Sequence, residues 1–223
     1  MIVSVVIPAY NEEKMIGKVV DGLKGKVSRI TVVDDGSRDL TAEKARQAGA
    51  EVIRHCLNRG QGAALQTGII YALNGGADFI VTFDADGQFL AEEIDLIVEP
   101  LLLGQVDVTL GSRFLDNKSD IPWEKLFILK IATWITNLYT GLKLTDIHNG
   151  FRGMSRRAAK LIQIRQDGMA HASEILEQIR KYNLKYLEVP VTIRYTDYSR
   201  LKGQKVSNSF RIIKDLLLSR FGR

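Results

Sequence analysis

The chain has 223 residues, of which 26% are charged and 45% hydrophobic, and its formal net charge is +5 at pH 7. This composition is that of an ordinary globular protein, and the length predicts a single domain over residues 1–223. A mild positive excess suits anionic partners such as nucleotide phosphates or lipid head groups. Nucleic acid is not expected as a partner, because basic residues are scattered until the last quarter of the chain and no zinc-finger or RNA-binding signature is present.

The single cysteine, Cys56, excludes an internal disulfide and indicates a reducing compartment. The apolar start of the chain runs straight into Pro8, which predicts a buried strand rather than a signal peptide. No stretch approaches the roughly 20 uninterrupted apolar residues of a membrane-spanning helix. We therefore expect a cytoplasmic protein, at most peripheral on the inner face of a membrane.

The first half of the chain alternates strand and helix signals. Continuous apolar runs predict strands at residues 2–7, 29–33, 51–54, 79–83 and 106–111. Helical segments are predicted between them at residues 12–23, 40–48, 62–74 and 91–103. Because continuous hydrophobicity is typical of strands buried on both faces, the expected fold class is α/β, with a mostly parallel, Rossmann-like sheet flanked by helices.

Polar loops follow three of these strands, at residues 8–12, 34–37 and 84–88. In an open parallel sheet, ligands bind beyond the carboxyl ends of the strands. The sequence therefore predicts one binding site built from all three loops.

Asp84 and Asp86 stand one residue apart, directly after the strand at residues 79–83. Two carboxylates at a strand end can face a common point, and Gln88 offers a further carbonyl oxygen. A hard divalent cation such as Mg²⁺ or Mn²⁺ prefers such oxygen ligands. A solvated acidic turn is the alternative, but the position after a buried strand favours a metal site.

Two further loops carry candidate ligand contacts. Asp35 follows the strand at residues 29–33, where a carboxylate can accept from a base N–H or a ribose hydroxyl, although plain turn chemistry is also compatible. Gly60 and Gly62 precede a helix, where glycines allow an anion to approach the helix N-terminus. That loop is neither a P-loop nor a dinucleotide fingerprint, so a tight loop entering the helix is equally favoured.

Arg113 and Arg152 are the cationic candidates near this edge. A leaving nucleoside diphosphate gains charge as its glycosidic bond breaks, and arginines aimed at it stabilise that transition state. A surface ion pair is the alternative for each arginine.

The second half is less regular. Its predicted elements are a long, largely apolar helix at residues 122–142, a polar turn at 146–152, helices at 156–164 and 173–182, a strand at 185–195, and a last helix from about residue 208. The first and last of these helices could lie in a membrane interface. Packing on the core or a dimer contact is the alternative.

The ordered motifs resemble those of family-two glycosyltransferases, in the branch that contains dolichol-phosphate mannose and glucose synthases. The stretches that carry the resemblance are residues 5–12, 32–37, 58–64, 84–88, 111–113 and 146–152. Each motif alone is modest evidence, whereas the ordered set is specific.

The resemblance implies an A-type glycosyltransferase fold, with a nucleotide-sugar-binding half over residues 1–115 and an acceptor-side half over residues 116–223. By resemblance, Asp86 and Gln88 ligate the metal, and Arg113 faces a phosphate of the donor or acceptor. The donor-binding residues that the resemblance and the loops together indicate are Pro8, Ala9, Tyr10, Glu12, Val33, Asp35, Gly62, Asp84 and Ala85.

The chain departs from that branch in its late basic loop at residues 197–207. The order of lysine and serine differs there, which leaves Arg200 and Lys205 as candidate phosphate contacts alongside Arg113 and Arg152. The Gln-x-x-Arg-Trp motif of processive synthases is absent, which indicates transfer of a single sugar.

The class of acceptor is inferred from the absence of a predicted general base. Transfer to a sugar hydroxyl needs a general base, which many relatives supply as the aspartate of a Glu-Asp pair. Here Glu174 has no aspartate beside it. A phosphate acceptor, with a second pKa of about 6, is already ionised at neutral pH. We therefore expect inverting transfer to a polyprenyl phosphate, with Asp146 and Glu174 as reserve candidates for a base.

Three alternatives remain. The first is transfer to a saccharide hydroxyl in surface-polysaccharide assembly. A sugar-phosphate nucleotidyltransferase is disfavoured, because residues 8–12 lack the Gly-rich basic loop of that class. A nucleotide-sugar-binding protein without turnover is disfavoured by the intact Asp84 and Asp86. The sugar, the nucleotide (UDP or GDP) and any homo-oligomeric state are left open.

Overall fold

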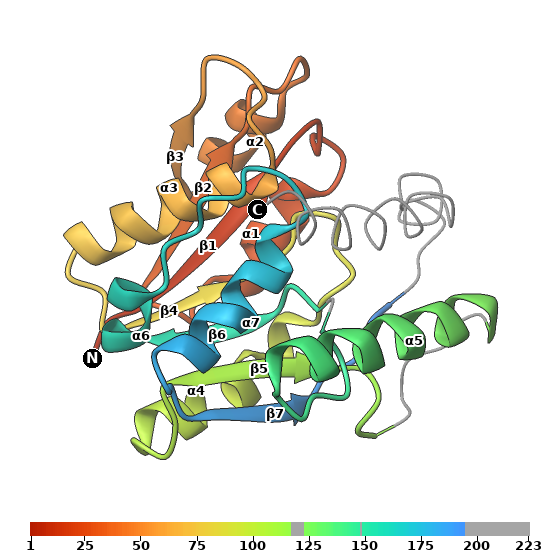
Figure 1. The fold of residues 1–223 in the computed structure, drawn as a ribbon. Coiled ribbons are helices and arrows are strands. Elements are labelled where there is room, and N and C mark those ends of the chain that lie inside the picture. The colour runs from red at the N-terminus through yellow and green to blue at the C-terminus, as the bar shows by residue number, and fades with distance from the viewer. Residues whose placement is uncertain (117–122, 148, 195–223) are drawn as a thin grey trace.

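The computed structural model describes residues 1–116, 123–147 and 149–194 (Figure 1). Its described strands form one sheet in the order β3-β2-β1-β4-β6-β5-β7. Their bounds are β1 (Val3–Ala9), β2 (Arg29–Asp34), β3 (Glu51–Arg54), β4 (Phe79–Thr82), β5 (Val108–Ser112), β6 (Arg152–Ser155) and β7 (Tyr186–Pro190). Neighbouring strands are parallel except where β6 pairs with β4 and β5. The predicted α/β class with a mostly parallel sheet is confirmed.

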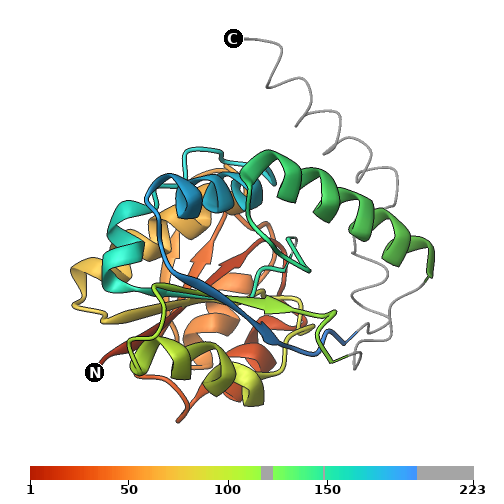
Figure 2. The same cartoon turned by 60° about the horizontal axis from the view of Figure 1, so that its bottom comes forward.

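Helices cover both faces of this sheet. They are α1 (Ile16–Leu23), α2 (Thr41–Gln47), α3 (Gln61–Asn74), the 3₁₀ helix η1 (Ala91–Glu93), α4 (Ile94–Leu102), α5 (Trp123–Thr140), α6 (Arg156–Leu161) and α7 (His171–Lys181). One hydrophobic core joins the sheet to α1, α2 and α4, and a second joins it to α3, α6 and α7. Figure 2 shows α5 and α7 above the sheet and α4 below it.

Strand β1 shows why the apolar runs are continuous. Val5 and Ile7 belong to one core and Val6 to the other, so successive side chains of β1 are buried on opposite faces. On the Val6 side, a Cβ added at Gly68 of α3 would lie 2.2 Å from Val6 Cγ1. The glycine therefore lets α3 approach β1 closely.

The second half differs from the sequence prediction at β6. Residues 146–152 were predicted as a polar turn followed by a helix, whereas the chain enters a strand at Arg152 and pairs antiparallel with both neighbours. The four residues of β6 include a glycine and an arginine and lack an apolar run, so β-propensity gives no signal there. The predicted loop at 197–207 and the helix from 208 lie outside the described residues.

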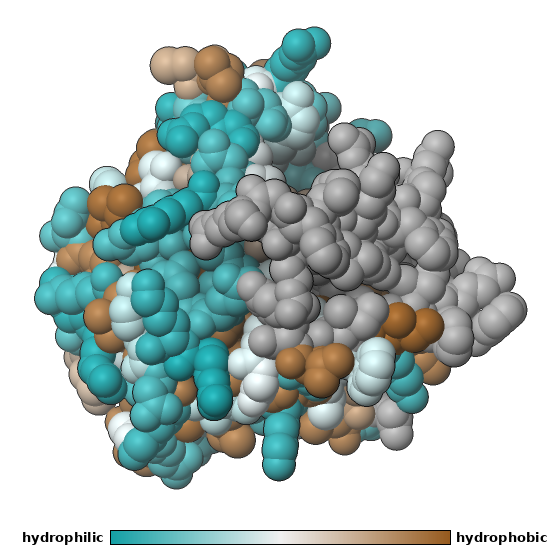
Figure 3. Space-filling view, in the orientation of Figure 1, coloured by the Kyte–Doolittle hydropathy of each residue, from teal (hydrophilic) through white to brown (hydrophobic). Residues whose placement is uncertain are grey.

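Helix α5 buries polar residues and exposes apolar ones. Thr133, Thr136 and Thr140 are buried. On the opposite side, Trp134 and Leu138 are 67% and 75% exposed. Figure 3 shows brown apolar side chains on the part of the surface where Figure 1 places α5. Among the residues that the structure describes, no helix combines the length and the apolar content needed to cross a membrane.

Candidate functional site

The three polar loops begin at the same edge of the sheet. In the parallel register, Ala9 at the end of β1 lies beside Asp34 at the end of β2, and Val6 lies beside Thr82 at the end of β4. The backbone N–H of Asp35 donates to Ala9 O at 2.8 Å. The fold thus brings together the segments that the sequence predicts as one site.

Hydrogen bonds join the loop after β1 to the loop after β2. Ser37 Oγ accepts from Asn11 N–H at 2.9 Å, and Thr41 Oγ1 accepts from Glu12 N–H at 2.8 Å. Of the residues predicted to contact the donor, Pro8, Ala9 and Val33 are buried, so they lie beneath the surface of these two loops. Tyr10 is 41% exposed, so its ring is accessible for stacking on a base.

Asp35 anchors the loop at residues 58–62. Its carboxylate accepts from Gly60 N–H at 2.6 Å and Arg59 N–H at 3.0 Å, and lies 2.7 Å from His55 Nδ1. The other ring nitrogen of His55 lies 3.0 Å from Thr67 Oγ1 of α3. Asp35 therefore has a structural role that its sequence context does not specify, and its contact with base or ribose stays a prediction.

The glycines of this loop allow another backbone segment of the protein to approach closely. A Cβ at Gly60 would lie 2.3 Å from Asp167 O, and one at Gly62 would lie 2.0 Å from Gln166 O. Gly62 N–H donates to Asp167 O at 2.8 Å. A close approach to the N-terminus of α3 was predicted and is present. The group that approaches is the backbone carbonyl of Asp167, not a ligand anion. The proposed contact between Gly62 and the donor stays a prediction.

Asp84 lies among charged groups at the end of β4. Although the residue is partly exposed, burial of its carboxyl group and the neighbouring Asp86 raise the pKa of Asp84 to about 7, while Arg152 and Arg113 act in the opposite direction. Gln61 Nε2 donates to Asp84 Oδ1 at 3.1 Å, and Asp86 Oδ1 accepts from Gln88 N–H at 3.0 Å. Ala85 between the two aspartates is buried.

These residues fit a divalent cation that is shared with a ligand. The described residues contain no group of three or more histidine, cysteine or acidic side chains arranged to hold an ion. Magnesium-type sites often use only one or two carboxylates and complete their coordination with water and phosphate. A carboxyl group whose pKa is raised by burial and by a second carboxylate is stabilised in its charged form by a nearby cation. Asp84, Asp86 and Gln88 are therefore suited to hold such an ion together with a diphosphate.

Arg113 is held by a buried carboxylate. Its Nε lies 2.5 Å from Asp146 Oδ2, and its backbone N–H donates to the same oxygen at 3.2 Å. Both side chains are at most 8% exposed. Asp146, predicted as a reserve base, thus contacts the arginine predicted to face a phosphate.

Glu188, which was not predicted as a site residue, fixes Asp146 in place. The Glu188 carboxylate accepts from Thr145 N–H at 2.8 Å and Asp146 N–H at 3.0 Å, and burial raises its pKa. Glu188 lies within a predicted strand and far along the chain from residue 146, so no local pattern marks it.

Arg152 stabilises the turn that precedes β6. Its Nε donates to Asn149 O at 2.9 Å and its Nη2 to Ile147 O at 3.3 Å. Burial lowers its pKa to about 10, against the effect of Asp84 and Asp146, so it remains a cation beside the aspartates. Its contact with a substrate phosphate stays a prediction.

The remaining predicted site residues lie elsewhere. Glu174 Oε2 on α7 accepts from Arg165 N–H and Gln166 N–H, both at 2.9 Å, so its carboxylate holds backbone. Its role as a base stays a prediction. Arg200 and Lys205 lie outside the described residues.

Comparison with known proteins identifies the family. Residues 4–162 match the family described as glycosyl transferase family 2. The chain belongs to glycosyltransferase family 2. This family-two glycosyltransferase is 40% identical over 221 residues to an uncharacterized protein of Methanocaldococcus jannaschii, covering 97% of this chain and 91% of that protein.

A second relative carries a functional name. The UDP-N-acetylglucosamine--dolichyl-phosphate N-acetylglucosaminyltransferase of Methanococcus voltae is 34% identical over 244 residues, covering 100% of this chain and 97% of that protein. The dolichol-phosphate mannosyltransferase of Pyrococcus furiosus is 32% identical over 97% of this chain and 64% of its own length. These relatives confirm the predicted resemblance to the dolichol-phosphate branch of the family.

Solved structures confirm the fold. Glucosyl-3-phosphoglycerate synthase from Mycobacterium tuberculosis, in complex with Mn²⁺ and UDP-glucose, superposes with a TM-score of 0.74 at 21% identity, covering 98% of this chain and 78% of that one. The family-two glycosyltransferase described here therefore has the A-type fold that its motifs imply.

Proposed function

We propose that this glycosyltransferase moves one sugar from a nucleotide-diphosphate sugar to a polyprenyl phosphate, with inversion and with the help of Mg²⁺ or Mn²⁺. The observation that carries the proposal is the Asp84–Asp86 pair at the end of β4, where burial and the neighbouring carboxylate raise the pKa of Asp84, so that a bound cation would stabilise its charged form. The M. voltae and P. furiosus relatives are named for transfer to dolichyl phosphate, which supports the acceptor class.

On the donor side, the chain supplies orientation and a positive field. Gln61 holds Asp84, and the Gln88 N–H holds Asp86, so both carboxylates have defined directions. A bound divalent cation would neutralise the charge that develops on the leaving diphosphate. Structures of the M. tuberculosis synthase contain Mn²⁺ or Mg²⁺ together with UDP, which supports the choice of ion. The buried cations Arg113 and Arg152 act on the same region.

On the acceptor side, both reserve bases are engaged with the chain. Asp146 is held by Arg113, and Glu174 accepts two backbone N–H groups. An acceptor that is already ionised needs no group to take its proton, and a phosphomonoester is largely ionised at neutral pH. This arrangement favours a phosphate over a sugar hydroxyl as acceptor.

The exposed side of α5 supports contact with the membrane that holds such an acceptor. Ile131, Trp134 and Leu138 occur at helical spacing and are 39%, 67% and 75% exposed. Apolar side chains that include tryptophan suit the boundary between head groups and acyl chains. We therefore propose that the protein is cytoplasmic and binds the membrane peripherally through α5.

The direct test is a transfer assay with the purified protein. UDP- and GDP-sugars are offered with Mn²⁺ or with EDTA, in the presence or absence of a short polyprenyl phosphate, and release of nucleoside diphosphate is measured. We expect metal-dependent release only when the lipid phosphate is present, and a loss of at least about a hundredfold in Asp86→Ala. Asp21→Ala is the matched control, because Asp21 pairs with Lys24 on the exposed side of α1.

Two outcomes would reject the proposal. Transfer to a soluble saccharide without lipid would indicate surface-polysaccharide assembly instead. Nucleotide-sugar binding without turnover, for every donor and acceptor, would indicate a binding protein.

A further inference from the structure

One segment of the second half lies against the N-terminus of α3. Residues 162–168 lie in the connection between α6 and α7, and Asp167 O accepts from Gly62 N–H at 2.8 Å and from Ala63 N–H at 3.4 Å. The contact is so close that any side chain at Gly60 or Gly62 would overlap carbonyl oxygens of this segment. The 162–168 segment therefore takes the place that a capping residue has at other helix N-termini.

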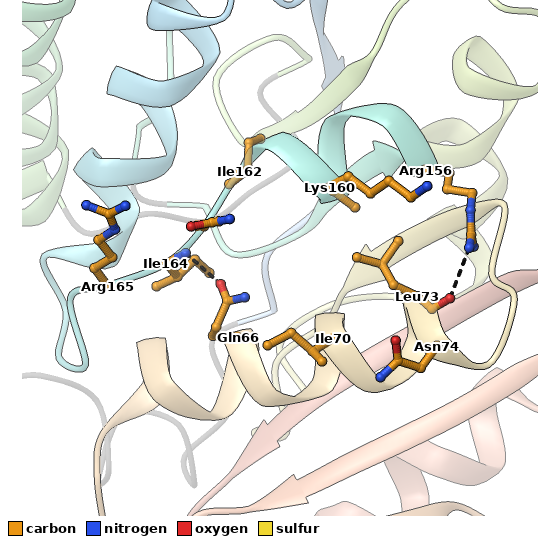
Figure 4. Close-up of a pocket in the computed structure, with 11 residues that line it drawn as sticks. Gln66, Ile70, Leu73, Asn74, Arg156, Lys160, Ile162, Ile164 and Arg165 are labelled. Atoms are coloured by element: carbon orange, nitrogen blue, oxygen red, sulfur yellow. Dashed lines mark hydrogen bonds between the residues drawn. The ribbon is translucent and has the colours of Figure 1, made fainter.

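The 162–168 segment is itself held from two sides. Gln66 Oε1 on α3 accepts from Ile164 N–H at 2.6 Å, a contact drawn in Figure 4. From α7, Glu174 binds the N–H groups of residues 165 and 166, and His171 Nδ1 lies 2.8 Å from Gly168 O. Burial lowers the pKa of His171 to about 4, so its ring is neutral at neutral pH.

The first residue of α3, Gln61, lies between two such anchors. On one side, Gly60 N–H donates to Asp35 at 2.6 Å, and on the other Gly62 N–H donates to Asp167 O. Its backbone is therefore fixed before and after the residue. From this position its side-chain Nε2 donates to Asp84 Oδ1 at 3.1 Å.

The carboxylate of Asp84 also faces a glycine. A Cβ at Gly150 would lie 2.8 Å from Asp84 Oδ2 and 3.0 Å from Oδ1, so Gly150 packs closely against the carboxylate and no side chain fits there. Gln61 and Gly150 thus confine the carboxylate together, Gln61 by a hydrogen bond and Gly150 by close packing. The neutral amide of Gln61 also holds the carboxylate without cancelling its negative charge, whereas a lysine or arginine in its place would cancel it.

We propose that Gln61 is a positioning residue for cation binding, which fixes the orientation of the Asp84 carboxylate toward the ion, and that the 162–168 segment keeps Gln61 in place. The inference rests on the proposed metal role of Asp84. Groups that orient a ligand of a metal ion typically change metal affinity by 10- to 100-fold when they are removed.

The test measures Mn²⁺ binding directly, by electron paramagnetic resonance of the free ion titrated with the full-length protein. Gln61→Met keeps the length and helix propensity of the side chain but removes the donor. We expect its dissociation constant for Mn²⁺ to rise at least about tenfold, with kcat for transfer reduced and the KM for the lipid phosphate unchanged. Gln61→Ala is the second variant, should the methionine side chain disturb folding.

Gln47→Met is the matched control. It makes the same substitution at an exposed position of α2, outside the 162–168 segment and the loops of the site. We expect its Mn²⁺ affinity to stay within about threefold of the wild-type value. Wild-type Mn²⁺ binding with unchanged affinity in folded Gln61→Met and Gln61→Ala would overturn the inference and leave the proposed function intact. Absence of Mn²⁺ binding in the active wild-type enzyme would overturn the metal role itself.

Discussion

The aspartates and the arginines of the site use their charges in opposite ways. At the end of β4, Asp84 is held by a neutral amide, and its burial and the neighbouring Asp86 raise its pKa, although Arg152 and Arg113 act against this. At β5 and the turn before β6, Arg113 binds a buried aspartate and Arg152 binds backbone carbonyl groups. The aspartates therefore offer a carboxylate whose charged form a bound cation can stabilise, whereas the arginines form hydrogen bonds with the chain itself.

This difference shows that an arginine in a family motif can be a structural anchor as well as a ligand contact. Arg113 and Arg152 remain cations beside Asp84, so they act on the site through their field while their hydrogen bonds hold the loops. If the comparison is correct, removing an arginine should reduce stability, and disturbing the aspartates should change ligand binding.

The largest effect is expected for Arg113→Ala. The substitution leaves Asp146 buried without the arginine, and removing one partner of a buried ion pair typically destabilises a protein by about 3–5 kcal/mol. Urea unfolding followed by circular dichroism measures the free energy of unfolding.

Arg157→Ala is the control for that change. Arg157 pairs with Asp107 at 3.0 Å, but its side chain is 65% exposed, so we expect a loss below about 1 kcal/mol. Equal losses in the two variants would mean that Arg113 is no structural anchor.

An intermediate effect is expected for the pH dependence of cation binding. Because the pKa of Asp84 is raised to about 7, a proton competes with the cation below that pH. The affinity for Mn²⁺ without nucleotide should therefore fall by about tenfold from pH 8 to pH 6. Titration of Mn²⁺ at a series of pH values measures this. A constant affinity over that range would show that Asp84 is not a ligand.

The smallest effect on the fold is expected for Trp134→Ser on α5. The side chain is 67% exposed, and surface substitutions usually change stability by no more than about 0.5 kcal/mol. Binding to anionic lipid vesicles in a sedimentation assay should nevertheless fall several-fold, because apolar area at the interface is lost. Thr133→Ser on the buried side of the same helix is the control for the helix itself. Unchanged sedimentation of Trp134→Ser would reject the membrane contact.

The same contrast explains how much the sequence could predict. Strands β1 to β5 follow from continuous apolar runs, and the loops after β1, β2 and β4 follow from polar residues at the strand ends, because both signals are local. Asp84 and Asp86 could be identified as a pair for the same reason. Helix α1 starts four residues later than predicted, at Ile16, since residues 12–15 form a turn whose carbonyl and amide groups bind locally.

The parts that could not be predicted depend on contacts distant along the chain. Glu188 binds the N–H groups of residues 145 and 146 from 42 residues away or more, and Asp167 caps a helix that begins at Gln61. Gly62 shows the consequence, since its motif indicates close approach but not what approaches. β6 was missed because its pairing partners, rather than its own residues, make it a strand.

The position of β6 also has a consequence for synthesis. β4 and β5 do not bond to each other, because β6 lies between them. When residues 79–112 leave the ribosome, the open edge of β4 has to wait for residues 152–155 to be made. Unpaired strand edges are prone to aggregation, and domains form progressively from the N-terminus during translation. Nascent chains that end before residue 155 are therefore the form of this protein that most needs protection by a chaperone.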